Sequence, residues 1–451
     1  PPEPAAPAAW RQLDPAALPA VRGETPDALA HWWRQLDDAM LSGLIEDALR
    51  ASPDLESAQA RLRESRARRG VADAARYPAL DATASASRTR SSEQTGGGLT
   101  RNLFSAGFDA SWELDVFGGV RRGVEAAQAD VEAAQAGLDD TRVSLAAEVA
   151  TNYVEVRSLQ QRLDIARANL DAQSETLQLT EWRAQAGLVN DQDVEQARSN
   201  REQTRAQIPL LQASLVEAEH RLDVLLGLTP GTLHPRLASA LALPSLPARI
   251  AVGIPADTLR QRPDVRAAER RLAAETARLG AAEAARYPSF SLSGSIGLDA
   301  LTLGGLGNGG AAASSLLAGI TAPLFDGGRL RAQAEAQDAV RAQAAVAYRQ
   351  AVLAALQDAE NALSALARSR EREQALAAAA TAARNAADLA RQRYGAGLID
   401  FQSVLDTERT RLSVEDGLAS ARADGVQALV RLYKALGGGW SPQAASAKDP
   451  A

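Results

Sequence analysis

Residues 53–78 read PDLESAQARLRESRARRGVADAARYP, and residues 263–288 read PDVRAAERRLAAETARLGAAEAARYP. The two stretches align without a gap, and 14 of their 26 positions are identical. Nine of these identities are residues other than Ala, so Ala-rich composition does not explain the match. The same offset of 210 residues places Gly187-Leu188 on Gly397-Leu398. The chain is therefore an internal duplication, and its repeat is far longer than a solenoid unit.

Both repeats predict the same order of elements: a helix of moderate length, a β-hairpin and a very long helical hairpin. In the first repeat (41–228) these are 41–76, 79–117 and 119–228, and in the second (256–438) they are 256–286, 289–325 and 327–438. The remaining segments are an extended N-terminal segment with an equatorial region (1–40), an equatorial linker (229–255) and a C-terminal tail (439–451).

The hairpin segments alternate between apolar and polar residues, as strands with one oily and one wet face do. Residues 104–116 and 289–298 alternate most clearly, and their expected partners are 80–90 and 316–325. Four strands cannot close a barrel with a lumen, which needs eight or more, and an open sheet leaves its edges unpaired. Two copies of the chain would supply eight strands, and three copies would supply twelve.

Aromatic residues gather where the predicted strands meet the predicted helices. A band of this kind is typical of one membrane interface of an outer-membrane barrel, so we expect an aromatic girdle there. The alternative is a soluble sheet whose apolar face packs on its own helices. The girdle residues are Tyr77, Trp112, Phe117, Tyr287 and Phe325.

Residues 119–186 contain no Pro and would extend roughly 100 Å as one helix. Apolar residues recur every seven positions from Val124 to Leu145 and, after a step of four, from Val149 to Leu177. Such interrupted heptads are typical of coiled helices that unwind locally. An ordinary coiled-coil scaffold would explain the heptads alone, but each long helix begins within a few residues of a membrane-type strand.

Composition narrows the function classes. The formal net charge of −7 disfavours a nucleic-acid partner. The chain has no Cys, and its three His show no ligand spacing, so the sequence predicts no metal site and no cofactor. No acid–base or nucleophile constellation stands out, so we expect no enzyme. No stretch is long and apolar enough for a membrane-spanning helix.

Several motifs resemble the TolC-like outer membrane efflux proteins, and among them the lipoprotein-type, NodT-like branch that serves resistance-nodulation-division (RND) pumps. The resemblance runs from about residue 30 to residue 436. The motifs are WELDVFGGVRR from Trp112, LLGLTPG from Leu225, VGIPADTLRQRPDVRAAERRLAAETARLGAAEAARYPSFSLSGSIG from Val252, APLFDGGRLRA from Ala322 and RYGAGLIDFQSVLDTERTRL from Arg393.

The resemblance implies an α+β membrane protein: a homotrimeric, 12-stranded outer-membrane barrel, four strands per chain, continued by a periplasmic α-helical barrel. It implies a passive, gated duct for small molecules in a tripartite pump, with a periplasmic adaptor, an inner-membrane RND transporter and outer-membrane lipid as partners. It also implies a lipid on an N-terminal Cys, which this chain lacks. Protein secretion, metal-ion export and a soluble coiled-coil scaffold are the alternative functions, and the single Met40 disfavours soft-metal export.

The resemblance also implies a gate at the periplasmic helix tips. Asp193, Tyr394, Asp406 and Arg409 match its motif residues, whereas Ser403 stands where relatives often carry a further acid. Symmetry-related carboxylates in a narrow pore would attract cations, and a paired Arg could hold the ring closed. The alternative for Asp406 and Arg409 is an i, i+3 surface pair worth a few tenths of a kcal/mol.

The two tip turns are expected to dock the adaptor. A simple helix C-cap, with Gly in left-handed geometry, is the other interpretation, and both can hold together. Exposed apolar residues at a tip would favour a partner. The docking residues are Gly187, Leu188, Val189, Gly397, Leu398 and Ile399.

Overall fold

The fold is described from a computed structural model of residues 7, 9–12, 20–21, 29–239, 242–247, 250–251 and 255–440. Most of the predicted N-terminal segment, and the tail from residue 441 onward, lie outside these described residues. The N-terminal lipid falls outside them too and stays a prediction.

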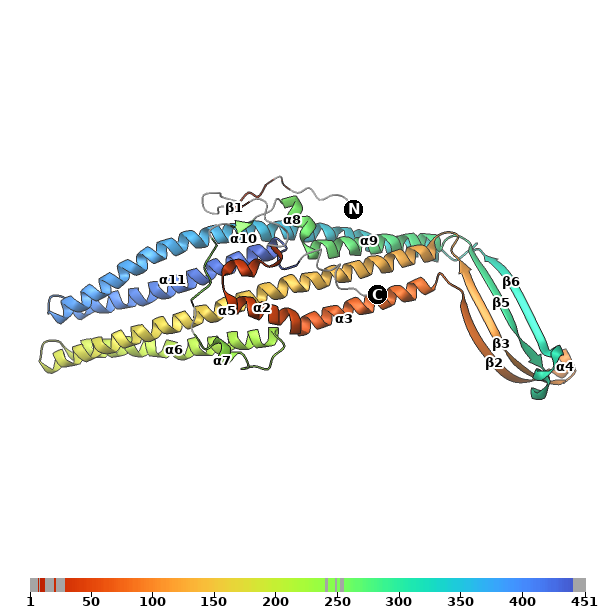
Figure 1. Cartoon of the computed structure of the whole chain (residues 1–451), viewed down its shortest axis with the longest axis horizontal. Coiled ribbons are helices and arrows are strands. Elements are labelled where there is room, and N and C mark those ends of the chain that lie inside the picture. Colours follow the sequence, from red (N-terminus) through yellow and green to blue (C-terminus); the bar gives the residue numbers. More distant parts are fainter. Residues whose placement is uncertain are drawn as a thin grey trace. The chain divides into compact units, whose positions relative to one another are not determined.

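The duplication extends to the ends of the long helices (Figure 1). The helices α5 (Gly119–Gln185) and α10 (Arg329–Gly395) both have 67 residues. Each is followed by a returning helix of 35 residues, α6 (Asp191–Leu225) and α11 (Phe401–Ala435). Equivalent ends are 210 positions apart, as in the aligned sequence. The two predicted long helical hairpins are therefore present.

An aspartate side chain caps the N-terminus of each long helix. The Asp115 carboxylate accepts backbone N–H groups of Val120 at 3.0 Å and Arg121 at 2.7 Å. Asp326 accepts those of Gly328 and Leu330, each at 2.9 Å. The bonds from Leu330 and Gly328 hold the pKa of Asp326 below its ordinary value. Each carboxylate thus accepts backbone N–H groups at the start of its helix, which explains why an Asp precedes both long helices.

The prediction of one continuous helix before each hairpin was wrong. The first helix is divided into α2 (Ala39–Ala51) and α3 (Pro53–Ala74). The second is divided into α8 (Pro255–Gln261) and α9 (Pro263–Ala284). Ser52 is extended, with ψ of 130°. Pro53 explains this break, because a proline ring disfavours helical geometry in the residue before it, and Pro263 stands at the equivalent place.

The hairpin strands form one antiparallel sheet of β2 (Ala79–Arg90), β3 (Thr100–Leu114), β5 (Ser289–Ala300) and β6 (Ala312–Thr321), in that order. The short helix α4 (Glu93–Gly96) lies in the first turn, and the 3-10 turns η2 (Leu303–Gly307) and η3 (Gly309–Ala311) lie in the second. The last strand ends four residues before the predicted 325. Pro323 follows two residues later and has no N–H for the ladder, so Leu324 and Phe325 are outside the sheet.

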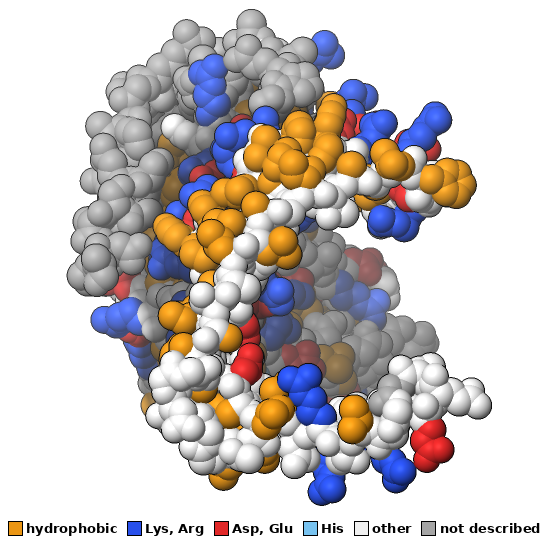
Figure 2. Space-filling model, turned by 90° about the vertical axis from the view of Figure 1, so that its right-hand side faces the viewer, with side chains coloured by type: hydrophobic (Ala, Val, Ile, Leu, Met, Phe, Trp, Pro, Cys, Tyr) orange, Lys and Arg blue, Asp and Glu red, His pale blue; other side chains and the backbone are white. Residues whose placement is uncertain are grey.

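The two faces of the sheet separate as the alternation predicted. Register pairs place Phe108 beside Ile296, and Ala110 beside Gly294, on one oily face. Ser105 and Ser295 lie on the opposite, wet face. On the oily face Leu80 is 70 % exposed and Leu316 is 79 % exposed, so the described residues do not cover it as a soluble packed sheet would require. Figure 2 views the molecule from the side of the sheet and shows hydrophobic side chains in patches.

The chain divides into two compact units, and each repeat contributes to both. One unit holds residues 60–135 and 267–350, including the sheet, and the other holds those described residues that fall within 3–59, 136–266 and 351–440. The second unit contains the largest fully buried side chains. Among them, Trp32 of η1 (Trp32–Leu36) stacks on Tyr433 with ring centroids 5.3 Å apart.

The smaller elements belong to the second unit. β1 (Ala20–Val21) and β4 (Ile250–Ala251) pair in parallel, and α7 (His234–Leu237) follows α6. None of the helices that the structure describes is long and apolar enough to cross a membrane.

Candidate functional site

The two predicted tips are turns of the same construction. Gly187 has φ of 69° and Gly397 has φ of 76°, the left-handed region that glycine enters without strain. Leu188 N–H donates to the Arg183 carbonyl at 2.8 Å. Leu398 N–H donates in the same way to the carbonyl of Arg393 at 2.9 Å. These bonds define a Schellman cap at each tip and confirm the C-cap interpretation.

The tip turns also expose apolar side chains. Leu188 is 67 % exposed and Leu398 is 73 % exposed, whereas Val189 and Ile399 are half-buried. Ile399 packs against a buried cluster beneath the tips. The second turn therefore directs Ile399 inward, and both turns offer the preceding Leu to solvent. An exposed Leu at each tip is what an adaptor-docking surface needs, and docking itself stays a prediction.

Each returning helix begins with a side-chain cap that the sequence interpretation had not assigned. The Asn190 side chain accepts the Asp193 N–H at 2.9 Å, and Asp400 accepts the Ser403 N–H at 2.9 Å. Bonds from the Ser403 hydroxyl and N–H keep the pKa of Asp400 below its ordinary value. Asp193 thus lies in the first turn of α6, one turn after the cap. An Asn or Asp directly after a turn is the sequence signal for such caps.

Tyr394 is a core residue that joins the two helical hairpins. It is 1 % exposed and belongs to the buried cluster beneath the tips. Its ring meets Phe401 edge-on, with centroids 5.8 Å apart. The cluster takes residues from both hairpins, namely Leu177, Ala197, Ala390, Tyr394, Phe401, Val404 and Leu405.

Arg183 of α5 holds Tyr394 in a way that sequence reasoning missed. Its guanidinium lies over the tyrosine ring, 4.4 Å from the centroid, and also donates to the Tyr394 backbone carbonyl. The Tyr394 hydroxyl donates to Thr180 Oγ1 at 3.4 Å. No hydrogen bond joins Tyr394 to Asp193 within the described part of the chain. The side-chain groups that hydrogen-bond to Tyr394 or lie over its ring as a cation, Thr180 and Arg183, therefore belong to α5 and not to the first turn of α6.

Asp406 and Arg409 are not paired with each other. Arg409 Nε donates to Asn200 Oδ1 on α6 at 3.1 Å, and Asp406 Oδ1 accepts from Gln402 at 3.0 Å. The i, i+3 surface pair is absent from the residues that the structure describes. Asn200 is 4 % exposed, so Arg409 is directed toward α6 by a buried amide. No sequence pattern indicates this contact, because the two residues are 209 positions apart.

A buried carboxylate on α11 links the same two hairpins. Glu408 is 5 % exposed and accepts the Thr176 hydroxyl at 2.6 Å. Burial raises the pKa of Glu408, while the Thr176 bond and the positive charges of Arg391 and Arg411 act in the opposite direction. Glu408 is a second residue that sequence reasoning missed.

Glu415, one heptad further along α11, is also buried. Its carboxylate accepts from Arg384 at 3.0 Å, Arg411 at 3.4 Å and Asn169 at 3.3 Å. Glu408 and Glu415 follow Phe401 at seven-residue intervals, on the seam of the helix. Acids at seam positions were the available signal, since such positions are normally apolar.

A groove of about 520 Å³ lies between α5, α6 and α11. Arg409 and Asn200 line it, together with a two-point ion pair between Arg162 and Asp416. The two N–O distances in that pair are 2.7 and 3.2 Å. Paired hydrogen bonds of this geometry are the stronger kind of ion pair. The hairpins are thus joined by reversible polar contacts from the tips down to this groove.

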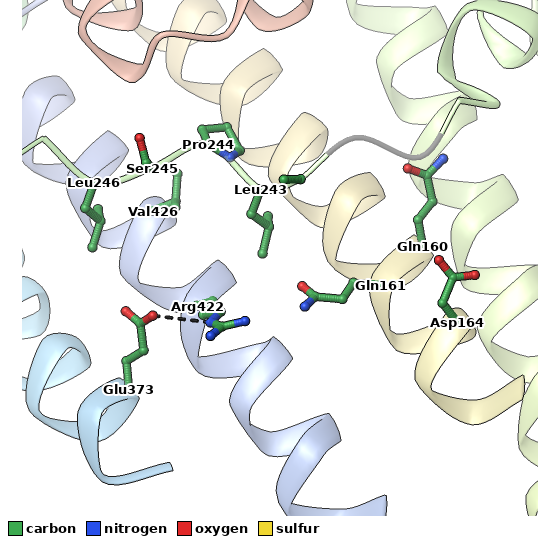
Figure 3. A pocket seen from close by; sticks show the side chains of 11 residues that line it. Gln160, Gln161, Asp164, Leu243, Pro244, Ser245, Leu246, Glu373, Arg422 and Val426 are labelled. Atoms are coloured by element: carbon green, nitrogen blue, oxygen red, sulfur yellow. Dashed lines mark hydrogen bonds and ion pairs between the residues drawn. The ribbon is translucent and has the colours of Figure 1, made fainter. Parts of the chain in front are cut away.

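The predicted linker lines a second cavity. Figure 3 shows Leu243, Pro244 and Leu246 of the linker above Arg422 and Glu373, which form an ion pair at 3.3 Å. Leu243 and Leu246 pack against a small buried cluster. This cavity of about 600 Å³ contains none of the predicted gate residues.

The predicted girdle residues lie at the helix end of the sheet. Phe117 stacks on Tyr287 with centroids 4.8 Å apart, and Trp112 Nε1 donates to the Arg76 carbonyl at 3.0 Å. Tyr77 is 65 % exposed and Phe325 is 94 % exposed. A membrane interface at these residues stays a prediction.

The oily, open sheet and the two long helical hairpins together are typical of one class of α+β proteins of the cell envelope. The family model described as "Outer membrane efflux protein" matches residues 44–228 and 254–438, so the chain belongs to this family. The matched segments coincide closely with the two predicted repeats.

Two relatives and one solved structure show how close the similarity is. The chain is 34% identical to Nodulation protein T of Rhizobium leguminosarum bv. viciae over 426 residues, 94% of this chain and 87% of the relative. It is 34% identical over 444 residues to the pyoverdine export outer membrane protein OpmQ of Pseudomonas putida KT2440, 97% of this chain and 92% of the relative. The solved outer-membrane channel OprN has 38% identity and a TM-score of 0.91, and the match covers 97% of this chain and 98% of OprN.

Proposed function

We propose that the chain is the outer-membrane channel of a tripartite efflux pump: a passive, gated duct, formed by three copies, that exports small molecules across the periplasm and outer membrane. The relatives are an export outer membrane protein and an outer-membrane channel, and the family is one of efflux proteins. A periplasmic adaptor and an inner-membrane RND transporter would be its partners.

The incomplete sheet is the observation that carries this proposal. β2 and β6 are its edge strands, and each offers unpaired backbone groups. The oily face is exposed over its full width, from Leu80 on β2 to Leu316 on β6. Closure by other copies would satisfy both edges and turn that face toward lipid, and three copies give a 12-stranded barrel.

The helix tips supply the proposed gate. Contacts from Arg183 to Tyr394, from Asn200 to Arg409 and from Thr176 to Glu408 hold one hairpin on the other. Each is noncovalent, so an adaptor at the exposed tip leucines could shift the balance between a closed and an open arrangement by binding one of them better. Asp406 and Asp400 would supply the carboxylates of the narrow opening.

Particle mass and conductance test the proposal together. We expect the detergent-extracted protein to have the mass of three chains, and a low conductance in planar bilayers. Arg409→Gln and Asp406→Asn should raise that conductance. Ser199→Ala is the matched control, since Ser199 occupies the position of Arg409 in the first repeat. A monomer that stays soluble in plain buffer without channel activity would reject the proposal in favour of a coiled-coil scaffold.

Transport assays distinguish the exported material. Vesicles that contain the assembled pump should extrude a hydrophobic dye only when this chain is present. If dye passage were absent while a folded protein or a metal ion passed, the chain would serve secretion or metal export on the same architecture.

A further inference from the structure

The oily face of the sheet ends in two arginines at the turn side. On β2 the residues of this face run from Leu80 through Ala86 to Arg88 and Arg90. Arg88 and Arg90 are both exposed, and neither forms an ion pair with any residue that the structure describes. Their cross-strand neighbours are the uncharged Asn102 and Thr100. Two unpaired positive charges therefore adjoin the apolar surface on the same face.

The spacing places these arginines beyond a membrane-sized apolar band. On β3 the band runs over the eleven residues from Phe104 to Leu114, which are ten steps of about 3.4 Å, or about 34 Å along the strand. A strand tilt of about 35–45° reduces this to roughly 24–28 Å, which matches the apolar band of about 25 Å in outer-membrane barrels. Ala86 pairs with Phe104, so Arg88 lies about 7 Å further along the strand and Arg90 about 14 Å. Both would lie at headgroup level.

The opposite end of the same face has a different composition. There Trp112 and Phe290 lie on the oily face, next to the stacked pair of Phe117 and Tyr287. Aromatic rings suit either membrane interface, whereas guanidinium groups favour one that carries negative charge. The helices leave the sheet at the aromatic end, so in the proposed channel the arginine end faces the outer leaflet. Figure 2 views the molecule from the sheet side and shows basic side chains projecting at the margins.

We propose that Arg88 and Arg90 bind the phosphate groups of an anionic outer-leaflet lipid, a phosphorylated glucosamine lipid of the lipid A type. The inference rests on the proposed barrel, which turns the oily face toward lipid. Guanidinium groups bind phosphate through two parallel hydrogen bonds, and residues two apart on a strand present theirs about 7 Å from each other on one face. The pair therefore fits one phosphorylated headgroup held beside the apolar band.

Arg101 provides a matched control within the same turn end. It pairs with Thr89, between Arg88 and Arg90 in register, but its side chain belongs to the wet face. It is also exposed. Removal of its charge changes the net charge as a single Arg88 substitution does, while leaving the lipid-facing surface intact.

Native mass spectrometry of the purified, detergent-solubilised protein tests the proposal, with bis-phosphorylated lipid A and dephosphorylated lipid A as probes. We expect the wild-type protein to bind the phosphorylated lipid about tenfold more tightly. The double variant Arg88→Gln/Arg90→Gln should lose this preference, and Arg101→Gln should keep it. The particle mass of each variant establishes that it has assembled.

Equal affinity of the wild-type protein for the two lipids would overturn the lipid proposal. The proposal would also fail if Arg101→Gln lost the preference for the phosphorylated lipid as fully as the double variant. Either result in a conducting trimer leaves the proposed channel function intact. A wild-type protein that neither assembles nor conducts would instead reject the channel itself, so the two failures are distinguishable.

Discussion

The two helical tips share a backbone and differ in their side chains. Both have a Schellman cap at glycine and an exposed leucine. At the offset of 210 residues, however, Tyr394 corresponds to Ala184, and Arg409 to Ser199. The duplication thus preserved the turn, which backbone geometry requires, while the residues that hold one hairpin on the other diverged. In the proposed gate, the two tips of each chain would therefore contribute different contacts.

The largest expected effect on tip stability comes from replacing Tyr394 with Ala, the residue at the equivalent position of the first repeat. Tyr394→Ala should weaken packing beneath the tips by about 3–5 kcal/mol, because a buried ring leaves a cavity and Arg183 loses the face on which it lies. Hydrogen exchange of the amides at 396–404 should accelerate accordingly, and conductance should rise. Tyr394→Phe keeps the ring and is the control. Unchanged exchange in Tyr394→Ala would show that the cluster does not hold the tip.

The shared turn can be broken at one glycine. Gly397→Ala should destabilise the second tip by about 1–2 kcal/mol, because Ala is strained at a positive φ. The neighbouring Gly395 ends α10 without a positive φ, so Gly395→Ala should leave the tip as stable or more so. Local hydrogen exchange compares the two variants. Equal destabilisation by both would contradict the assigned turn geometry.

A smaller effect is expected at Glu408, whose counterpart in the first repeat is the exposed Arg198. Burial raises the pKa of Glu408, so the folded tip favours the protonated form. Its stabilising contribution is then present below the ordinary glutamate pKa and is lost as the pH rises through the raised value. Glu408→Gln should stabilise the tip at neutral pH and flatten this dependence.

Hydrogen exchange at the tip, measured across that pH range, checks whether the tip loses stability as the pH rises. Glu415→Gln is the comparison variant, because Glu415 is held by Arg384 and Arg411 and should lose stability instead. A tip that becomes less stable on acidification, through a step absent in Glu408→Gln, would refute the assignment.

The smallest effect is expected at the helix caps. Asp400→Asn makes the second cap equal to Asn190 of the first, and Asn and Asp cap helices about equally well, so the melting temperature should hardly change. Asp400→Ala should lower the melting temperature, because the Ser403 N–H loses its acceptor. Thermal melts of both variants decide this, and a large loss in Asp400→Asn would mean that the charge, and not the cap, stabilises α11.

Much of the fold could be predicted because its signals are local or recur at one fixed offset. The Pro-free tract with its heptads and the repeat offset predicted both long helices and both tips to within one or two residues, and alternation predicted the two faces of the sheet. The errors came from prolines whose effect was underestimated. Pro53 divided a predicted helix, and Pro323 shortened the last strand.

The candidate site was predicted less completely than the fold. Periodicity indicates that a helix has a buried seam, but it does not name the partner across it. The contacts of Arg409 with Asn200 and of Tyr394 with Arg183 join residues more than 200 positions apart. Glu408 was overlooked because a lone acid in a charged helix usually faces solvent.

The sequence by itself determined the duplication, the helical and strand periods, the tip glycines and the family resemblance, because each depends on residues close together or at one fixed offset. The tertiary structure alone decided which side chains meet across the hairpins. That choice depends on how two long helices pack along their length, where small differences in rotation change every partner.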